Sequence, residues 1–306
     1  MSQLRWTDPH GMAVASPLPV GHGDVLRALA RASHLAYLGP AALEEALGTV
    51  PVDLRSCSPR TRVDPDTQLL VLQQDGWVVL AFRGSEMRVN DWVLNARAVL
   101  LSDTGGGRRH AGFHRGLTVT GSGSYDWEAL KAELVAKQAA DPALRLWITG
   151  HSLGGALATL AALDLLRTTH VPLQGVATFG QPRVGDGAWA TSARNALGDR
   201  YLALAAAHDP VPHLPLGEWG YQHVPGVRRP SAGGLHDVTD AQLGTASLIQ
   251  SILRELELDD PLAALSALAK GLEGVLALLL ERAARLGSLG AAHDIASYEA
   301  ALEDLP

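Results

Sequence analysis

The sequence predicts an α/β fold in which a mainly parallel central sheet is flanked by helices. Three observations predict it. Short apolar runs typical of buried strands alternate with helical stretches between residues 67 and 205. Asp75-Gly76 separates two such runs, which is a strong hairpin signal. A glycine-rich turn at residues 150–154 joins a strand run to an alanine-rich helix. Strands that alternate with helices are connected by right-handed crossovers and therefore lie parallel.

The elements follow one another in a simple order. Residues 1–22 are rich in proline and glycine and are expected to be irregular, and residues 25–38 are expected to form a helix. Strands are predicted at residues 69–72, 77–82, 144–149, 175–179 and 201–205, and further helices at 127–138, 156–166 and 189–197. In such sheets, ligands bind beyond the carboxyl ends of the strands. The segments that follow Phe82, Thr149, Phe179 and Ala205 are therefore where a site is expected.

Residues 239–290 are predicted to be a helical insertion within one domain that spans residues 1–306. In its second half, apolar residues recur at spacings of three and four and form a stripe, namely Leu265, Leu268, Leu272, Val275, Leu279 and Leu286. The mixed Lys, Arg and Glu residues beside the stripe do not form the basic face of a membrane-binding helix. We therefore favour packing or a cap over a membrane role for this insertion.

Composition limits the kinds of partner and cellular compartment that are expected for this protein. The net charge of −7 disfavours a nucleic-acid partner, because phosphate binding requires clustered Lys and Arg. Cys57 is the single cysteine, so no intrachain disulfide is possible. Residues 1–24 lack the continuous apolar segment of a secretory signal, and the longest apolar stretch near the other end, residues 274–280, is too short to span a bilayer. From these features we expect a cytoplasmic protein.

The turn Gly150-His151-Ser152-Leu153-Gly154 fits the G-x-S-x-G nucleophile elbow. A sharp turn between a strand and a helix lifts the serine hydroxyl above the sheet, and the helix N-terminus favours developing negative charge. The alternative interpretation is a glycine-rich helix start with Ser152 as N-cap. The predicted strand before Ser152 and helix after it favour a nucleophile on an α/β-hydrolase fold.

A serine nucleophile needs a base, and the base needs an orienting acid. On this fold the chain order is Ser, then Asp or Glu, then His. Asp209 follows the strand at 201–205 and is the expected acid, whereas Asp186, in Gly185-Asp186-Gly187, is more easily interpreted as a loop residue.

Four histidines follow Asp209 and could serve as the base. His213 is too close to Asp209 in sequence, and His223 lies in a predicted loop. Chain order and composition leave His236 and His293 equally open.

An oxyanion hole needs two donors. One is expected from the backbone N–H of Leu153, directly after the nucleophile. The second is expected from the loop Phe82-Arg83-Gly84-Ser85, where the glycine permits close approach. Each such donor stabilises a transition state by about 3 kcal/mol.

Several blocks in one order resemble the class 3 lipase family, the fungal-type triacylglycerol lipases and their plant and bacterial relatives. They are FRGS at residues 82–85 with Asp91-Trp92 and Asn95 after it, HRGL at 114–117, GHSLGGA at 150–156, FGQPRVGD at 179–186, DPVPHLP at 209–215 and YQHV at 221–224. The resemblance covers residues 67–224 and the C-terminal end. The long helical insertion departs from the compact fungal pattern.

The resemblance implies three further assignments. It places the base at His293, because the family ends with His, a short spacer and Tyr, as in His293 to Tyr298. It assigns Ser85 to the oxyanion hole through its N–H and its hydroxyl. It also implies a lid after the oxyanion block, which corresponds to residues 86–101.

We therefore expect a carboxylic ester hydrolase, most similar to a triacylglycerol lipase, with Ser152, Asp209 and His293 as its triad and an acyl-enzyme intermediate. No metal or organic cofactor is implied. The expected partner is a lipid or small-molecule ester, with transient contact at a lipid interface, and the oligomeric state stays open. Alternatives are a phospholipase A1-like enzyme, a short-chain esterase, or a non-catalytic lipid-binding protein. The last is expected to lack a catalytic residue.

Overall fold

The computed structural model describes residues 19–47, 52–57, 67–74, 76–84, 99–118, 126–231, 233–245, 247–248, 293–303 and 305. Within these ranges an eight-stranded sheet has the order β1-β2-β3-β6-β7-β9-β11-β12. The five strands β3, β6, β7, β9 and β11 are parallel, while β1, β2 and β12 pair antiparallel at the two edges. The prediction of a mainly parallel sheet is confirmed.

The bounds of β2, β3, β6, β7 and β9 lie close to the predicted apolar runs, whereas β1, β11 and β12 were not predicted. The strands of the large sheet are β1 Val52–Cys57, β2 Thr67–Gln74, β3 Trp77–Phe82, β6 Arg145–His151, β7 Leu173–Phe179, β9 Tyr201–Leu204, β11 Val227–Ser231 and β12 Gly234–Asp237. The predicted hairpin joins β2 to β3, with Gly76 at φ +80° in the turn. A glycine adopts this left-handed conformation without the steric cost of a Cβ atom.

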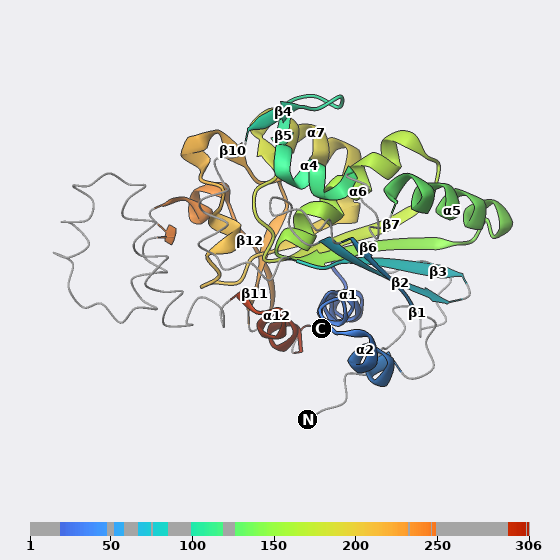
Figure 1. Ribbon diagram of the computed structural model, residues 1–306. Helices are drawn as coiled ribbons and strands as arrows, with labels where there is room; N and C mark the ends of the chain where they lie inside the picture. Colours follow the sequence, from blue (N-terminus) through green and yellow to red (C-terminus); the bar gives the residue numbers. More distant parts are fainter. Residues whose placement is uncertain are drawn as a thin grey trace.

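Helices cover both faces of the sheet (Figure 1). One face packs against α1 Gly23–Leu35 and α12 Ile295–Leu302, and the other against α4 Ala111–Thr118, α5 Trp127–Ala140, α6 Leu153–Thr168 and α7 Gly187–Leu197. Strand β3 serves both layers, because alternate side chains point to opposite faces. Val79 belongs to the α1 side and Leu80 to the α6 side. A strand buried on both faces is a continuous apolar run, as β3 is.

Smaller elements complete the described structure. A four-stranded sheet has the order β10-β8-β5-β4. Its strands are β4 Leu100–Ser102, β5 Arg108–His110, β8 Gly185–Asp186 and β10 Tyr221–Gln222, and the remaining elements are α2 Pro40–Leu47 and the short 3-10 helices η1 Gly198–Arg200, η2 Val211–His213, η3 Gly217–Trp219 and η4 Asp240–Leu243. Asp186 caps α7 through Trp189 N–H and pairs with Arg108, so its role is structural, as expected.

Helices α1 and α12 connect the two ends of the described chain. The Arg27 guanidinium donates to the carbonyl oxygens of Leu302 at 3.1 Å and Leu305 at 2.7 Å. His34 pairs with Glu299 at 2.7 Å, and this carboxylate raises the pKa of the histidine. Since α12 follows His293 directly, these contacts hold the C-terminal segment against the sheet.

The helical insertion predicted at residues 239–290 begins one residue before η4, but most of it, residues 249–290, lies outside the described residues, as do residues 86–98 of the predicted lid. In the part of the chain that is described, no helix is long and apolar enough to cross a membrane.

Candidate active site

Ser152 occupies the turn between β6 and α6, as expected of a nucleophile elbow. Its backbone has φ 59° and ψ −129°, and it is the one non-glycine residue with positive φ among those described. Such a conformation costs about 1–3 kcal/mol and persists only where neighbouring contacts enforce it. The Ser152 N–H donates to the Phe179 carbonyl at 2.9 Å, and its side chain makes no capping hydrogen bond. The N-cap interpretation is therefore not supported.

The glycines of the elbow are required by close packing. A Cβ atom on Gly154 would lie 2.0 Å from the Phe82 carbonyl oxygen, and one on Gly150 would lie 2.2 Å from the Gly154 oxygen. Helix α6 thus begins in direct contact with the end of β3. This contact brings the N-terminus of α6, and the N–H of buried Leu153, to the sheet edge where the loop after β3 leaves.

Asp209 and His293 form a hydrogen-bonded pair beyond the ends of the parallel strands. His293 Nδ1 lies 2.9 Å from each oxygen of the fully buried Asp209 carboxylate. The same carboxylate accepts from the Tyr298 hydroxyl at 2.5 Å and from Val211 N–H at 2.8 Å. In the described structure, His293 Nε2 is buried without a hydrogen-bond partner. The pair thus holds the imidazole with Nδ1 toward Asp209 and leaves Nε2 available for a proton.

Gly180 allows this pair to lie beside the elbow. It has φ +59°, and a Cβ atom there would lie 2.6 Å from Asp209 Oδ2 and 2.9 Å from His293 Cε1. Gly180 lies in the FGQPRVGD block, but nothing in that block indicates its role. Its need for glycine depends on contacts with residues 29 and 113 positions away, which no local pattern reveals.

The other candidate histidines lie elsewhere. His236 is exposed in the edge strand β12. His213 Nδ1 lies 3.4 Å from the Gly244 carbonyl, and His223 Nε2 lies 2.6 Å from that of Pro212. Burial lowers the pKa of His213 to about 4 and that of His223 to about 3. Of the candidates left open by chain order, the structure brings His293 to Asp209 and leaves His236 on the surface.

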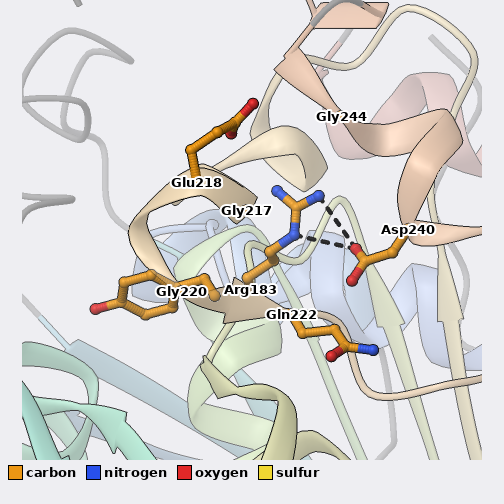
Figure 2. Close-up of a pocket in the computed structure, with 8 residues that line it drawn as sticks. Arg183, Gly217, Glu218, Gly220, Gln222, Asp240 and Gly244 are labelled. Carbon is orange, nitrogen blue, oxygen red and sulfur yellow. Dashed lines mark hydrogen bonds and ion pairs between the residues drawn. The ribbon is translucent and has the colours of Figure 1, made fainter.

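A buried arginine fixes the two loops on which the site depends. The Arg183 guanidinium donates to the carbonyls of His213 at 2.5 Å, Pro215 at 3.0 Å and Leu243 at 2.9 Å, and also binds Asp240. Arg183 lines an open cavity of about 570 Å³, and Figure 2 shows its two interactions with Asp240 as dashed lines. All three guanidinium nitrogens are used within the protein. Arg183 therefore joins the loop after β7 to the loop that carries Asp209.

The loop after β3 contacts the elbow, as predicted for an oxyanion loop. A Cβ atom on Gly84 would lie 2.7 Å from the His151 carbonyl oxygen and 3.0 Å from Ser152 Cβ. Gly84 N–H donates to the Tyr37 hydroxyl at 3.1 Å. Ser85, the predicted second oxyanion donor, lies outside the described residues.

His151 is a further polar residue of the site. It is 5% exposed, and its ring lies 4.5 Å from that of His293, centroid to centroid. Its Nδ1 lies 2.8 Å from the Tyr37 hydroxyl, and its Nε2 lies 2.6 Å from the His293 carbonyl oxygen. The roles of His151, Tyr37 and Tyr298 are not apparent from the sequence, because their hydrogen-bond partners are remote in sequence. Groups of His, Cys, Asp and Glu suited to a metal ion were not found among the described side chains.

A mainly parallel sheet with a strained serine at a strand–helix turn, and a His–Asp pair beyond the same strand ends, defines the α/β-hydrolase fold class. Residues 79–219 match the family model described as lipase (class 3). This central part of the chain is thus similar to the class 3 lipases.

Similar proteins are fungal lipases. Secreted mono- and diacylglycerol lipase A of Penicillium cyclopium is 34% identical over 185 residues, which cover 59% of this chain and 56% of that protein. A lipase of Rhizomucor miehei is 31% identical over 205 residues, which cover 64% of this chain and 50% of that protein. The chain thus spans about half the length of the curated relatives that it matches.

Solved structures of lipases have a fold similar to that of this chain. A mutant form of MDLA from Penicillium cyclopium has a TM-score of 0.54 and 26% identity, covering 70% of this chain and 83% of the other. A triacylglycerol lipase described as having a serine protease triad at its catalytic centre has a TM-score of 0.54 and 26% identity, covering 67% of this chain and 79% of the other. The predicted family and fold are confirmed, and a lipase-type ester hydrolase is confirmed as the activity of the family.

The prediction of a cytoplasmic protein is wrong. Relatives from Fusarium solani, Penicillium cyclopium and Malassezia restricta are named secreted lipases. The prediction depended on a missing apolar segment in residues 1–24, which is a compositional feature and does not report the compartment in which the folded domain works.

Proposed function

We propose that this protein hydrolyses carboxylic esters of lipids through an acyl-enzyme formed on Ser152. The observation that carries the proposal is the His293–Asp209 pair, whose 2.9 Å hydrogen bonds leave Nε2 available next to the strained serine turn. A binding protein without catalysis would not need a buried carboxylate to orient an imidazole in this way. That arrangement favours an enzyme over a non-catalytic lipid-binding protein on the same fold.

In the proposed mechanism, Ser152 Oγ attacks the acyl carbonyl while His293 Nε2 takes its proton. Asp209 holds His293 in the tautomer with a proton on Nδ1 and stabilises the imidazolium that forms. His293 then gives the proton to the departing alkoxide, and water releases the acid by the same steps in reverse. Leu153 N–H, at the start of α6, stabilises the oxyanion, and we assign the second donor to Ser85. Each donor is worth about 3 kcal/mol.

We propose acylglycerols as the substrate class and work outside the cell as the setting. The support is that the similar proteins are named secreted mono- and diacylglycerol lipases and a triacylglycerol lipase. Transient contact with a lipid interface follows from such substrates.

We further propose that residues 1–306 form one domain in which 239–290 is a helical insertion. Limited proteolysis that cuts first within 239–290 and leaves one folded core would support this division.

Labelling with a fluorophosphonate probe tests the mechanism. We expect the wild-type chain to label and Ser152→Ala not to label. His293→Ala should label at least about a hundredfold more slowly, because general-base catalysis contributes roughly 10²–10⁴-fold. His236→Ala, which removes an exposed histidine, is the matched control and should label at the wild-type rate.

Failure of the wild type to label would contradict the catalytic proposal, and loss of labelling only in His236→Ala would reverse the assignment of the base. Hydrolysis rates on mono-, di- and triacylglycerol emulsions, phosphatidylcholine vesicles and a soluble butyrate ester then distinguish the substrate classes. Higher rates on the acylglycerols support the proposal. Preference for phosphatidylcholine or for the soluble ester would favour the phospholipase A1-like or the short-chain esterase alternative.

A further inference from the structure

Two side chains outside the triad connect three segments of the candidate site through hydrogen bonds. Tyr37, just after α1, and His151, at the end of β6, form a chain of hydrogen bonds. Gly84 N–H lies 3.1 Å from the Tyr37 hydroxyl, that hydroxyl lies 2.8 Å from His151 Nδ1, and His151 Nε2 lies 2.6 Å from the His293 carbonyl. The oxyanion loop, the nucleophile turn and the C-terminal segment are thereby joined.

The direction of each hydrogen bond in this chain is fixed by chemistry. The His293 carbonyl only accepts, so His151 carries its proton on Nε2. A neutral imidazole then has Nδ1 as an acceptor, which requires the Tyr37 hydroxyl to donate. The Tyr37 oxygen is left to accept from Gly84 N–H. Each hydrogen bond thus has a defined donor and acceptor. Protonation of His151 at Nδ1 would remove the acceptor to which the Tyr37 hydroxyl donates.

Burial keeps His151 in the neutral form that this order requires. Desolvation and the nearby His293 ring hold the pKa of His151 well below its usual value. The polar groups around its ring include the Tyr37 hydroxyl, the His293 ring and carbonyl, and the Tyr298 ring at 6.1 Å, and the charge of His34 also lowers the pKa of His151. His151 therefore stays uncharged when His293 becomes an imidazolium, and the contact between the two rings adds no second positive charge.

We propose that Tyr37 and His151 are positioning residues for ester hydrolysis: together they fix the oxyanion loop, through Gly84, and the backbone of His293 relative to Ser152. The proposal rests on the function proposed above. Close packing supports it, since a Cβ atom on Gly84 would lie 2.2 Å from the Tyr37 hydroxyl oxygen. Misplacement of reacting groups by about 1 Å costs roughly a hundredfold in rate. Loss of this link is thus expected to slow the reaction while leaving substrate binding intact.

The test compares Tyr37→Phe with Tyr201→Phe. Both substitutions remove one tyrosine hydroxyl from a hydrogen bond, but the Tyr201 hydroxyl donates to Gln181 at 3.3 Å and takes no part in this chain. With a soluble short-chain ester, we expect Tyr37→Phe to lower kcat about tenfold or more, with KM within about twofold and phosphonate labelling slowed in parallel. Tyr201→Phe should keep both rates, whatever its effect on Tm.

A second variant separates positioning from folding. His151→Gln places an amide N–H near the position of Nε2, where it can donate to the His293 carbonyl, but it leaves no acceptor at the position of Nδ1 for the Tyr37 hydroxyl. We expect it to lower kcat, and adding Tyr37→Phe should lower kcat little further, because both substitutions break the same link. If Tyr37→Phe does not fold, the kcat of His151→Gln decides alone.

Two results would overturn the inference. One is wild-type kcat in Tyr37→Phe or, if that variant does not fold, in His151→Gln; the other is an equal loss of kcat in Tyr201→Phe. In both cases the proposed function stands as long as wild-type labelling depends on Ser152. Wild-type protein that does not label would instead reject the proposed function itself.

Discussion

At the scale of single residues, Asp209 is the most constrained group of the site. It is fully buried and accepts from His293, Tyr298 and Val211. A buried carboxylate is costly unless such donors surround it. The G-x-S-x-G turn selects Ser152, and chain order then selects Asp209, which follows the predicted strand at residues 201–205. Chain order does not separate His293 from His236, because a loop histidine has no local signal that reports its partner.

Gly180→Ala should abolish activity, although its backbone strain should be close to that of the control variant Gly198→Ala. The new Cβ atom would lie 2.6 Å from Asp209 Oδ2 and would displace the acid or the base. Gly198→Ala is matched to it, since Gly198 has φ +57° and a Cβ atom added there would have no neighbour within 4 Å. Both should lose about 1–2 kcal/mol of stability from the left-handed backbone. Comparable kcat in the two variants would show that the Gly180 contact is unimportant.

At the scale of elements, the sequence predicted those that are buried on both faces or strongly periodic. The hairpin, β6, β7, β9, α6 and α7 lie within a few residues of their predicted bounds. Strand β1 was missed, because Val52–Cys57 mixes charged and apolar residues and pairs along a single edge. The strands of the small sheet have two or three residues each, too few for a period to appear.

The contact of α1 with α12 predicts an effect at a distance. Arg27→Met removes two hydrogen bonds to the last carbonyls of the described C-terminal segment. Hydrogen exchange within residues 295–302 should accelerate and kcat should fall, because His293 directly precedes α12. Arg200→Met is the control, since Arg200 binds the equivalent carbonyls of Ala196 and Leu197 at the end of α7. Unchanged exchange in α12 after Arg27→Met would contradict the role of this contact.

At the scale of the whole molecule, buried neutral histidines predict loss of stability in acid. His213 and His223 have pKa values of about 4 and 3 when folded, against about 6.5 when unfolded. Their contribution is complete above pH 6.5, falls as the pH decreases, and is lost once the pH passes below the folded values. At pH 5 each should already have lost roughly 2 kcal/mol. The raised pKa of His34 acts in the opposite direction but involves one partly exposed pair.

Urea unfolding at pH 7.5 and pH 5 measures this loss directly. His223→Gln, which can still donate to the Pro212 carbonyl but does not titrate, should reduce the difference between the two pH values. A difference that is equal in the variant and the wild type would assign acid sensitivity to other groups. Composition does not predict this acid sensitivity, because it gives the number of histidines but not which of them are buried.

The pairing of α1 with α12 also sets an order of events during synthesis. Ser152 and Asp209 leave the ribosome first, and His293 follows Asp209 by 84 residues. At translation speeds of about 5–20 residues per second, that interval lasts roughly 4 to 17 s. During this interval the nascent chain contains Ser152 without its base, and the face of α1 that packs against α12 is uncovered. Under the proposed mechanism, hydrolysis begins only when α12 has packed against α1 and His293 has reached Asp209.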